Sequence, residues 1–331
     1  MNVSDYDTNM FLESLKASAN AIVNKTTEGI ELWASETTIS EAKYKIALFN
    51  GVCIYHLLVE KSGNVDKDFP SYFDDDYFVR ITCDSEIDFK VADSLAVSFI
   101  FELHATHNIK VSFSEGRADS STTYYDPDEL KGQSYRIFPL LYGLGIKELL
   151  ELYSTAKMAD DTDYKILGFT KVIEYISPTI AKEELLASVS LELTSPTIFA
   201  PTSEFIIGLS EIFKKHQNDI SKDSELIRLA VTTVTQISDI WDCLPKYIKP
   251  KQTERVDMLD DNTRKSCIED LITSIYDTRN EIAHAKANYE KKGKECPLRD
   301  RMQFSIVLDK IAVRCIRWFA LQPEEKRVVL S

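Results

Sequence analysis

Residues 267–286 read CIEDLITSIYDTRNEIAHAK and carry the most informative pattern in the chain. Apolar residues from Ile268 to Ile282 recur at helical spacing, which predicts an amphipathic helix over 267–285 that buries this face. His284 follows Ile282 by two positions, or about 200° around an ideal helix, so we expect its side chain to point away from that core.

Two further polar residues stand near His284 on this helix. Asn280 lies four residues before His284 and shares its face, so its amide can orient the imidazole. Arg279 lies about 140° from His284 on the helical wheel, and its long side chain can reach the same groove. The three residues therefore form one candidate site off the core face, and we expect changes to them to leave the fold nearly intact.

The rest of the C-terminal half also has helical periodicity. Further helices are expected over 147–159, 164–176, 183–193, 205–215, 226–241 and 304–319. The last of these has its apolar residues on one stripe at Phe304, Leu308, Ile311, Cys315 and Trp318. The pattern predicts an all-α helical bundle over residues 145–322.

The N-terminal part is mixed. Residues 77–83 and 109–113 are rich in β-branched and aromatic residues and predict strands, whereas 92–104 predicts a helix packed on their sheet. Residues 45–56 fit a hairpin or a buried helix, and periodicity leaves both open. Residues 115–133 have the Gly, Ser and Pro content of a linker or long loop.

These segments predict two domains, a mixed α+β domain over residues 1–135 and the helical bundle over 145–322. The net charge is −14 over 331 residues and is unevenly distributed. Residues 245–322 hold 16 Lys and Arg against 12 Asp and Glu, whereas residues 1–244 carry a net charge of −18. We expect the acidic part to repel RNA and to serve as a sensor, a regulatory domain or a platform for a protein partner.

Several classes of protein lack support in the sequence. The six cysteines include no Cys-x-x-Cys pair, so they predict buried thiols rather than a zinc or redox site. His104 and His107 with Glu102 are a weak metal signal without a further ligand nearby, so no metal and no cofactor are expected. No basic leader and no run of about 18 apolar residues occurs, which favours a cytoplasmic protein without a membrane partner.

The segment from Arg279 to His284 fits the Arg-x(4–6)-His signature of HEPN domains, including the frequent Asn directly after Arg. Residues 275–284 resemble these proteins over their whole length. Residues 153–177, with Glu174, resemble the opening helices of the same domain. The chain is therefore similar to HEPN proteins over about half its length, and the resemblance implies a HEPN-like helical bundle.

The resemblance also implies an activity. Many HEPN proteins are endoribonucleases that need no metal and cut RNA by attack of its 2′-hydroxyl on the adjacent phosphorus. His284 would move protons, Arg279 would bind the phosphate oxygens, and Asn280 would orient the site. Because one histidine does not easily serve both steps, the resemblance implies a homodimer with paired His284 residues, acting in phage defence or as a toxin.

Two alternatives remain open at the sequence level. Some HEPN domains are non-catalytic scaffolds that bind a nucleotide or a partner protein, and Arg279 would then be a structural ion-pair partner of Asp277 or Glu281. A basic segment follows the motif, and it fits either a track for the RNA backbone or an ordinary solvated loop. Its candidate RNA-binding residues are Lys286, Lys291, Lys292 and Lys294.

Overall fold

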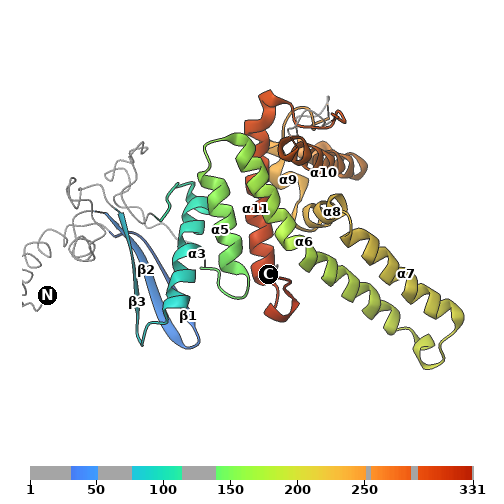
Figure 1. Ribbon diagram of the computed structural model, residues 1–331, viewed down its shortest axis with the longest axis horizontal. Coiled ribbons are helices and arrows are strands. Elements are labelled where there is room, and N and C mark those ends of the chain that lie inside the picture. The colour runs from blue at the N-terminus through green and yellow to red at the C-terminus, as the bar shows by residue number, and fades with distance from the viewer. Residues whose placement is uncertain (1–30, 51–76, 114–138, 251–254, 285–289, 330–331) are drawn as a thin grey trace, which may run out of the picture. The chain divides into compact units, whose positions relative to one another are not determined.

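A computed structural model describes residues 31–50, 77–113, 139–250, 255–284 and 290–329. The chain divides by its internal contacts into two units, with the boundary near residue 140. Unit 1 comprises residues up to 107 together with 111–140, and unit 2 comprises 108–110 together with 141–331. A three-stranded sheet lies in unit 1, and the described part of unit 2 is mostly helical (Figure 1).

The sheet of unit 1 is antiparallel, with strand order β1-β2-β3. Its strands are β1 (Glu31–Ile39), β2 (Ala42–Asn50) and β3 (Tyr77–Cys83). Ser40 and Glu41 join β1 to β2, and both have positive φ, 48° and 74°. A two-residue turn of this kind matches the right-handed twist of the paired strands, so it fixes the hairpin register.

The strand predicted over 77–83 is confirmed. Of the residues left open between hairpin and helix, 45–50 belong to the central strand β2, and 51–56 lie outside the described residues. Strand β1 was not predicted from the sequence. The predicted linker over 115–133 also falls almost wholly outside the described residues.

Helix α3 (Phe89–His107) packs on β2 and β3 through buried residues that include Leu95, Phe99 and Leu103. It contains the helix predicted over 92–104. The strand predicted over 109–113 is wrong, because these residues have no regular structure. The backbone of Val111 contacts a side chain of α3 instead of a strand. Its carbonyl oxygen lies 2.6 Å, and its amide nitrogen 3.2 Å, from His104 Nε2.

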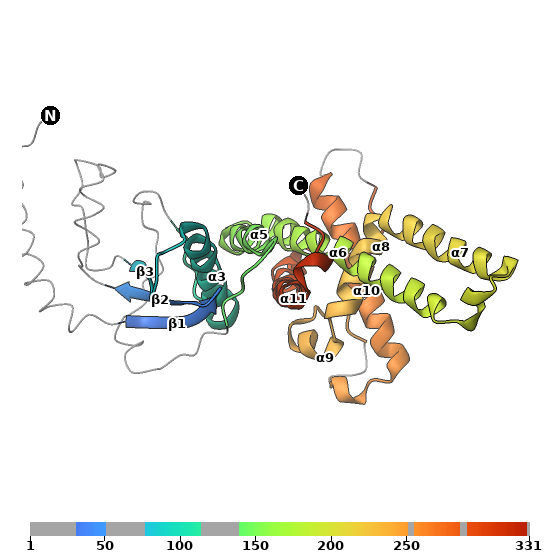
Figure 2. The same cartoon turned by 90° about the horizontal axis from the view of Figure 1, so that it is seen from below.

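The helices of the described part of unit 2 are α5 (Ile146–Met158), α6 (Thr162–Leu193), α7 (Ser203–Ile220), α8 (Asp223–Val234), α9 (Ile237–Ile240), α10 (Asp261–Ala283) and α11 (Arg301–Leu321). Helix α6 packs on α5, α7, α8, α10 and α11, and α11 also packs on α5 and α8 (Figure 2). None of the helices in the described ranges is long and apolar enough to cross a membrane.

The predicted stripe of the last helix is confirmed in four of its five positions. Phe304, Leu308, Ile311 and Cys315 are fully buried, whereas Trp318 is half-buried and its neighbour Phe319 takes the core position. The helix predicted over 226–241 is instead α8 followed by the short α9. Thr235 and Gln236, between them, have extended backbones.

The helices predicted over 164–176 and 183–193 are one continuous helix, α6, with Pro178 inside it. Proline lacks the N–H that would bond the carbonyl of Glu174, four residues earlier. The Ser177 hydroxyl donates to that carbonyl at 2.7 Å and replaces the missing partner. The predicted interruption between residues 176 and 183 is therefore wrong, because a local side chain satisfies the group that the proline leaves free.

Ser177→Ala is expected to lower the free energy of unfolding by about 1–3 kcal/mol, since it leaves a carbonyl in the bundle without a donor. Ser305→Ala is the matched control. The buried Ser305 hydroxyl also donates to a carbonyl three residues earlier at 2.7 Å, but no proline follows it. Urea unfolding of both variants measures the difference, and equal losses would refute the role given to Ser177.

Candidate functional site

Helix α10 presents the candidate motif in its last turn. Asp260 caps its N-terminus by accepting a bond from the Thr263 amide at 2.8 Å. The helix ends at Ala283, and His284 is its C-cap residue, whose amide donates to the Asn280 carbonyl at 2.9 Å. The helix therefore ends two residues before the predicted end, and the exposed His284 stands at the point where the chain leaves it.

Arg279 faces the neighbouring helices and is only 25% exposed. Its Nε lies 3.2 Å from Oε1 of Glu174 on α6, and its Nη2 lies 3.8 Å from Oδ2 of Asp223, the first residue of α8. Arg279 lies off the apolar core face, as expected, but its ion pairs make it more than a surface residue whose replacement would leave the fold unaffected. Its guanidinium ties α10 to α6 and α8, on which the helix packs.

Glu174 is the carboxylate most closely coupled to Arg279. Burial raises the pKa of the Glu174 carboxyl, the guanidinium of Arg279 lowers it in part, and the nearby Asp223 raises it further. The charge of Glu174 therefore depends on Arg279. From the sequence, Glu174 was indicated only by the family resemblance and Asp223 was not predicted, because neither residue lies near Arg279 in the chain.

Asn280 bonds to its neighbour in the motif. Its side-chain oxygen accepts a hydrogen bond from Arg279 Nη1 at 3.0 Å. Within the described ranges, no hydrogen bond joins the Asn280 side chain to His284, so the expected orientation of the imidazole by this amide is not seen. Asn280 instead helps to fix the plane of the guanidinium.

The carboxylates proposed as structural partners of Arg279 face another way. Asp277 Oδ1 pairs with Lys292 at 3.2 Å, and Glu281 pairs with Lys291 at 2.8 Å and with Arg301 at 2.6 Å. The predicted pairing of Arg279 with Asp277 or Glu281 is therefore wrong. These two carboxylates face the segment after the motif, whereas Arg279 faces α6 and α8.

The candidate RNA-binding lysines are engaged by carboxylates of α10. Lys291 and Lys292 have the partners given above, and Lys294 Nζ lies 3.0 Å from Asp270 Oδ1. Lys292 also stands over the Tyr276 ring, 5.1 Å from its centroid. Lys286 lies outside the described residues. Each described lysine thus neutralises a carboxylate of α10. This pairing differs from both alternatives left open by the sequence, a free basic track for RNA and an ordinary solvated loop.

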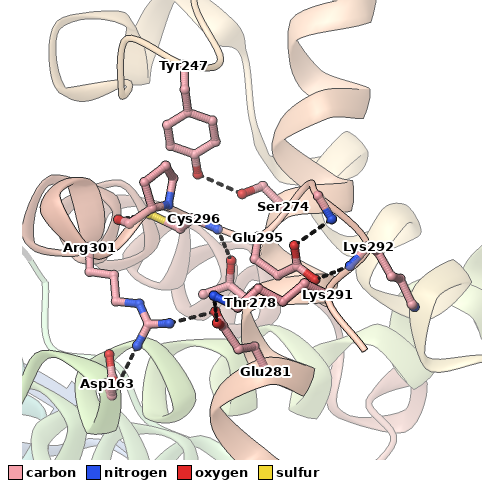
Figure 3. Close-up of polar contacts among 12 residues, drawn as sticks. Asp163, Tyr247, Ser274, Thr278, Glu281, Lys291, Lys292, Glu295, Cys296 and Arg301 are labelled. Carbon is pink, nitrogen blue, oxygen red and sulfur yellow. Dashed lines mark hydrogen bonds and ion pairs between the residues drawn. The ribbon is translucent and has the colours of Figure 1, made fainter. Parts of the chain in front are cut away.

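A polar network holds the segment after the motif against α10 (Figure 3). The Cys296 amide donates to the Thr278 hydroxyl at 2.7 Å. Arg301, with a side chain 10% exposed, donates to Asp163 at 2.5 Å and to Glu281 at 2.6 Å. Arg301 therefore joins the starts of α6 and α11 to the end of α10 and fixes the helix that carries the site.

Within the described residues, the cysteines and the possible metal ligands form no further candidate site. Cys267, Cys296 and Cys315 are buried free thiols, and burial raises the pKa of Cys296 to about 11. Across the described ranges, no group of three or more His, Cys, Asp or Glu residues is placed to hold a metal ion. The chemistry of the described site thus rests on a histidine, an arginine and the carboxylates beside them.

Comparisons with protein-family models, curated proteins and solved structures find no match to the chain. The described architecture is a small antiparallel sheet followed by a mostly helical unit. A HEPN-type assignment therefore depends on the resemblance of the motif from Arg279 to His284, and on the chemistry that this turn of α10 can support.

Proposed function

We propose that the chain is a metal-independent endoribonuclease of the HEPN type. The observation that carries the proposal is the last turn of α10, which presents Arg279 in a fixed orientation and His284 exposed at the helix end. His284 moves protons between the RNA hydroxyls and solvent, and Arg279 stabilises the charge that develops on the phosphate. A role in phage defence or as a toxin is part of this proposal and comes from the resemblance, whereas the cytoplasmic location is proposed from the sequence pattern.

The contacts of Arg279 set a condition for RNA binding. A guanidinium has five N–H donors, of which Nε faces Glu174 and Nη1 bonds Asn280. Nη2 is 3.8 Å from Asp223, which is beyond hydrogen-bond distance, and the Asp223 side chain is 61% exposed. In the proposed mechanism a phosphate displaces Asp223 and bonds Nη2, while Glu174 and Asn280 keep the guanidinium in place.

The proposed active form is a homodimer, since the chain contains one copy of the motif and two proton transfers are required. His284 of one copy removes the proton from the 2′-hydroxyl, and the same residue of the second copy protonates the leaving oxygen. The acidic N-terminal part has a regulatory or partner-binding role in this proposal, because its charge opposes RNA binding.

A non-catalytic scaffold is the second candidate function. The observation that favours it is the neutralisation of the cations: Arg279 faces two carboxylates, and Lys291, Lys292 and Lys294 are each paired with one. Such pairs are typical of a structural network. A scaffold predicts tight binding of a nucleotide or a protein partner with no turnover of RNA.

Incubation of the purified full chain with mixed RNA in EDTA separates the two candidate functions. The ribonuclease proposal predicts cleavage whose rate is unchanged by the chelator, because the proposed site uses no metal. Loss of all cleavage in EDTA, with recovery on adding a divalent cation, would contradict it. Binding of RNA or a nucleotide without any cleavage, in the presence or absence of metal, would favour the scaffold.

A further inference from the structure

The second half of α6 and the whole of α7 form a two-helix arm, here defined as residues 182–220. In both views the two helices run side by side and extend away from α5, α10 and α11 (Figures 1 and 2). Phe205 is the one buried residue of α7. Within the described ranges, most of the arm is therefore two helices packed on each other, with their outer faces open to solvent.

One face of the arm carries a regular apolar stripe. On α7 it consists of Ile206, Phe213 and Ile220, which are 56%, 51% and 44% exposed. On α6 it consists of Leu186 and Leu193, each 44% exposed. The spacing of seven residues, which is close to two helical turns, places each set on one side of its helix.

The two stripes lie on the same side of the arm. Each stripe residue comes one position after a residue that faces the other helix. Ile206 follows the buried Phe205 on α7, and Leu186 follows the half-buried Leu185 on α6. A step of one residue turns about 100° around a helix in a fixed sense. Because the two helices run antiparallel, equal steps from their shared contact turn both stripes toward one face.

This face carries no charge at the positions between the apolar residues. Lys182, four residues before Leu186, lies on the same side of α6, and its Nζ donates to the Glu325 carbonyl at 3.1 Å. Ser190, Ser210 and Gln217 fall on the same side by helical spacing, and all three are exposed. The charged residues of α7, such as Glu211 and Lys215, fall on other sides of the helix. A neutral apolar face is complementary to a copy of itself, whereas a charged partner would find no opposite charge on it.

The area of the face fits a dimer. At about 200 Å² for each fully exposed large apolar residue, the five stripe residues expose roughly 500 Å². Two copies would bury about 1,000 Å² between them, near the lower limit for a specific interface. Two antiparallel hairpins that join through apolar faces form a four-helix bundle, which is a stable architecture with two-fold symmetry.

We propose that the apolar face of the arm is the interface with a second copy of this chain. The stripes of the two arms interdigitate around a two-fold axis, so each residue of the stripe contacts a stripe residue of the partner. The interface is inferred from the arm alone. It does not depend on whether the chain cleaves RNA, and it would hold together the homodimer that the proposed ribonuclease also requires. It assigns self-association to residues of α6 and α7, which lie outside the motif of α10.

Light scattering on the full chain, at concentrations from low to high micromolar, tests the proposal through the molar mass. The parent is expected to have twice the mass of one chain. Ile206→Glu and, separately, Phe213→Glu should reduce it to that of a single chain, because each places a charge in the apolar seam. Circular dichroism checks that each variant keeps its helical content.

Ile207→Glu is the matched control. Ile207 is the next residue on α7 and is also 56% exposed, but it points away from the stripe. The control is expected to remain a dimer. A parent of single-chain mass, a dimer that survives Ile206→Glu and Phe213→Glu, or equal dissociation by Ile206→Glu and Ile207→Glu would each overturn the proposal.

Discussion

His284→Ala is expected to reduce the rate of RNA cleavage by about 10² to 10⁴, the usual effect of losing a general acid–base group. The side chain is exposed at the end of α10, and only its backbone amide bonds the helix, to the Asn280 carbonyl. Alanine keeps that bond. The free energy of unfolding should therefore stay within about 0.5 kcal/mol of the parent, as for most surface changes.

His216→Ala is the control for this variant. His216 is a half-buried histidine of α7, in the same unit but on a helix that does not carry the motif. Its replacement should leave the cleavage rate unchanged. Full activity of His284→Ala, in a preparation free of contaminating nuclease, would exclude His284 from the chemistry.

Arg279→Ala is expected to lose about 10² to 10³ in cleavage rate, the scale for removal of one donor that stabilises developing charge. The expectation for stability differs from that for His284, because Arg279 is largely buried and pairs with Glu174. Without Arg279, the Glu174 carboxyl loses its counter-charge, and burial already raises the pKa of this carboxyl. We expect a destabilisation of about 1–3 kcal/mol. The cleavage rate of Asn280→Ala should lie between those of the parent and of Arg279→Ala.

The double variant Arg279→Ala with Glu174→Gln separates the two roles of the arginine. The neutral amide needs no counter-charge, so most of the lost stability should return, as measured by urea unfolding. The cleavage activity should not return, because the phosphate still lacks its guanidinium. Recovery of activity in the double variant would mean that Arg279 acts only as a structural ion-pair partner.

The sequence predicts most helices of unit 2 because their core faces are regular. The stripe from Phe304 to Cys315 repeats over a full helix, and its residues are buried where periodicity places them. The interruption expected between residues 176 and 183 is wrong, because the Ser177 hydroxyl compensates locally for Pro178. The periodicity of apolar residues carries no information on a single hydrogen bond of this kind.

The ion pairs of the site could not be predicted from the sequence. Arg279 meets Glu174 and Asp223 from two other helices, and local spacing carries no information on such contacts. The same holds for Arg301, which bonds Asp163 across the unit. Local spacing did indicate the position of His284, because the residue lies beyond the apolar face of a single helix.

The small sheet was predicted in part for a related reason. The strand β3 has a dense run of β-branched and aromatic residues, whereas β1 reads ELWASETTI and mixes polar and apolar residues. Its place at the edge of the sheet, paired on one side with β2, tolerates such a composition. The turn at Ser40 and Glu41 sets the pairing of this strand with β2, and the buried Trp33 packs its ring against His107.

The end groups of the RNA fragments test the central claim most directly. Attack by the 2′-hydroxyl predicts 5′ fragments that end in a 2′,3′-cyclic phosphate or its hydrolysis product. The parent should produce these ends in EDTA, and His284→Ala should not. Fragments from the parent that instead end in a free 3′-hydroxyl would contradict the proposed reaction, since water and not the RNA would then have attacked the phosphorus.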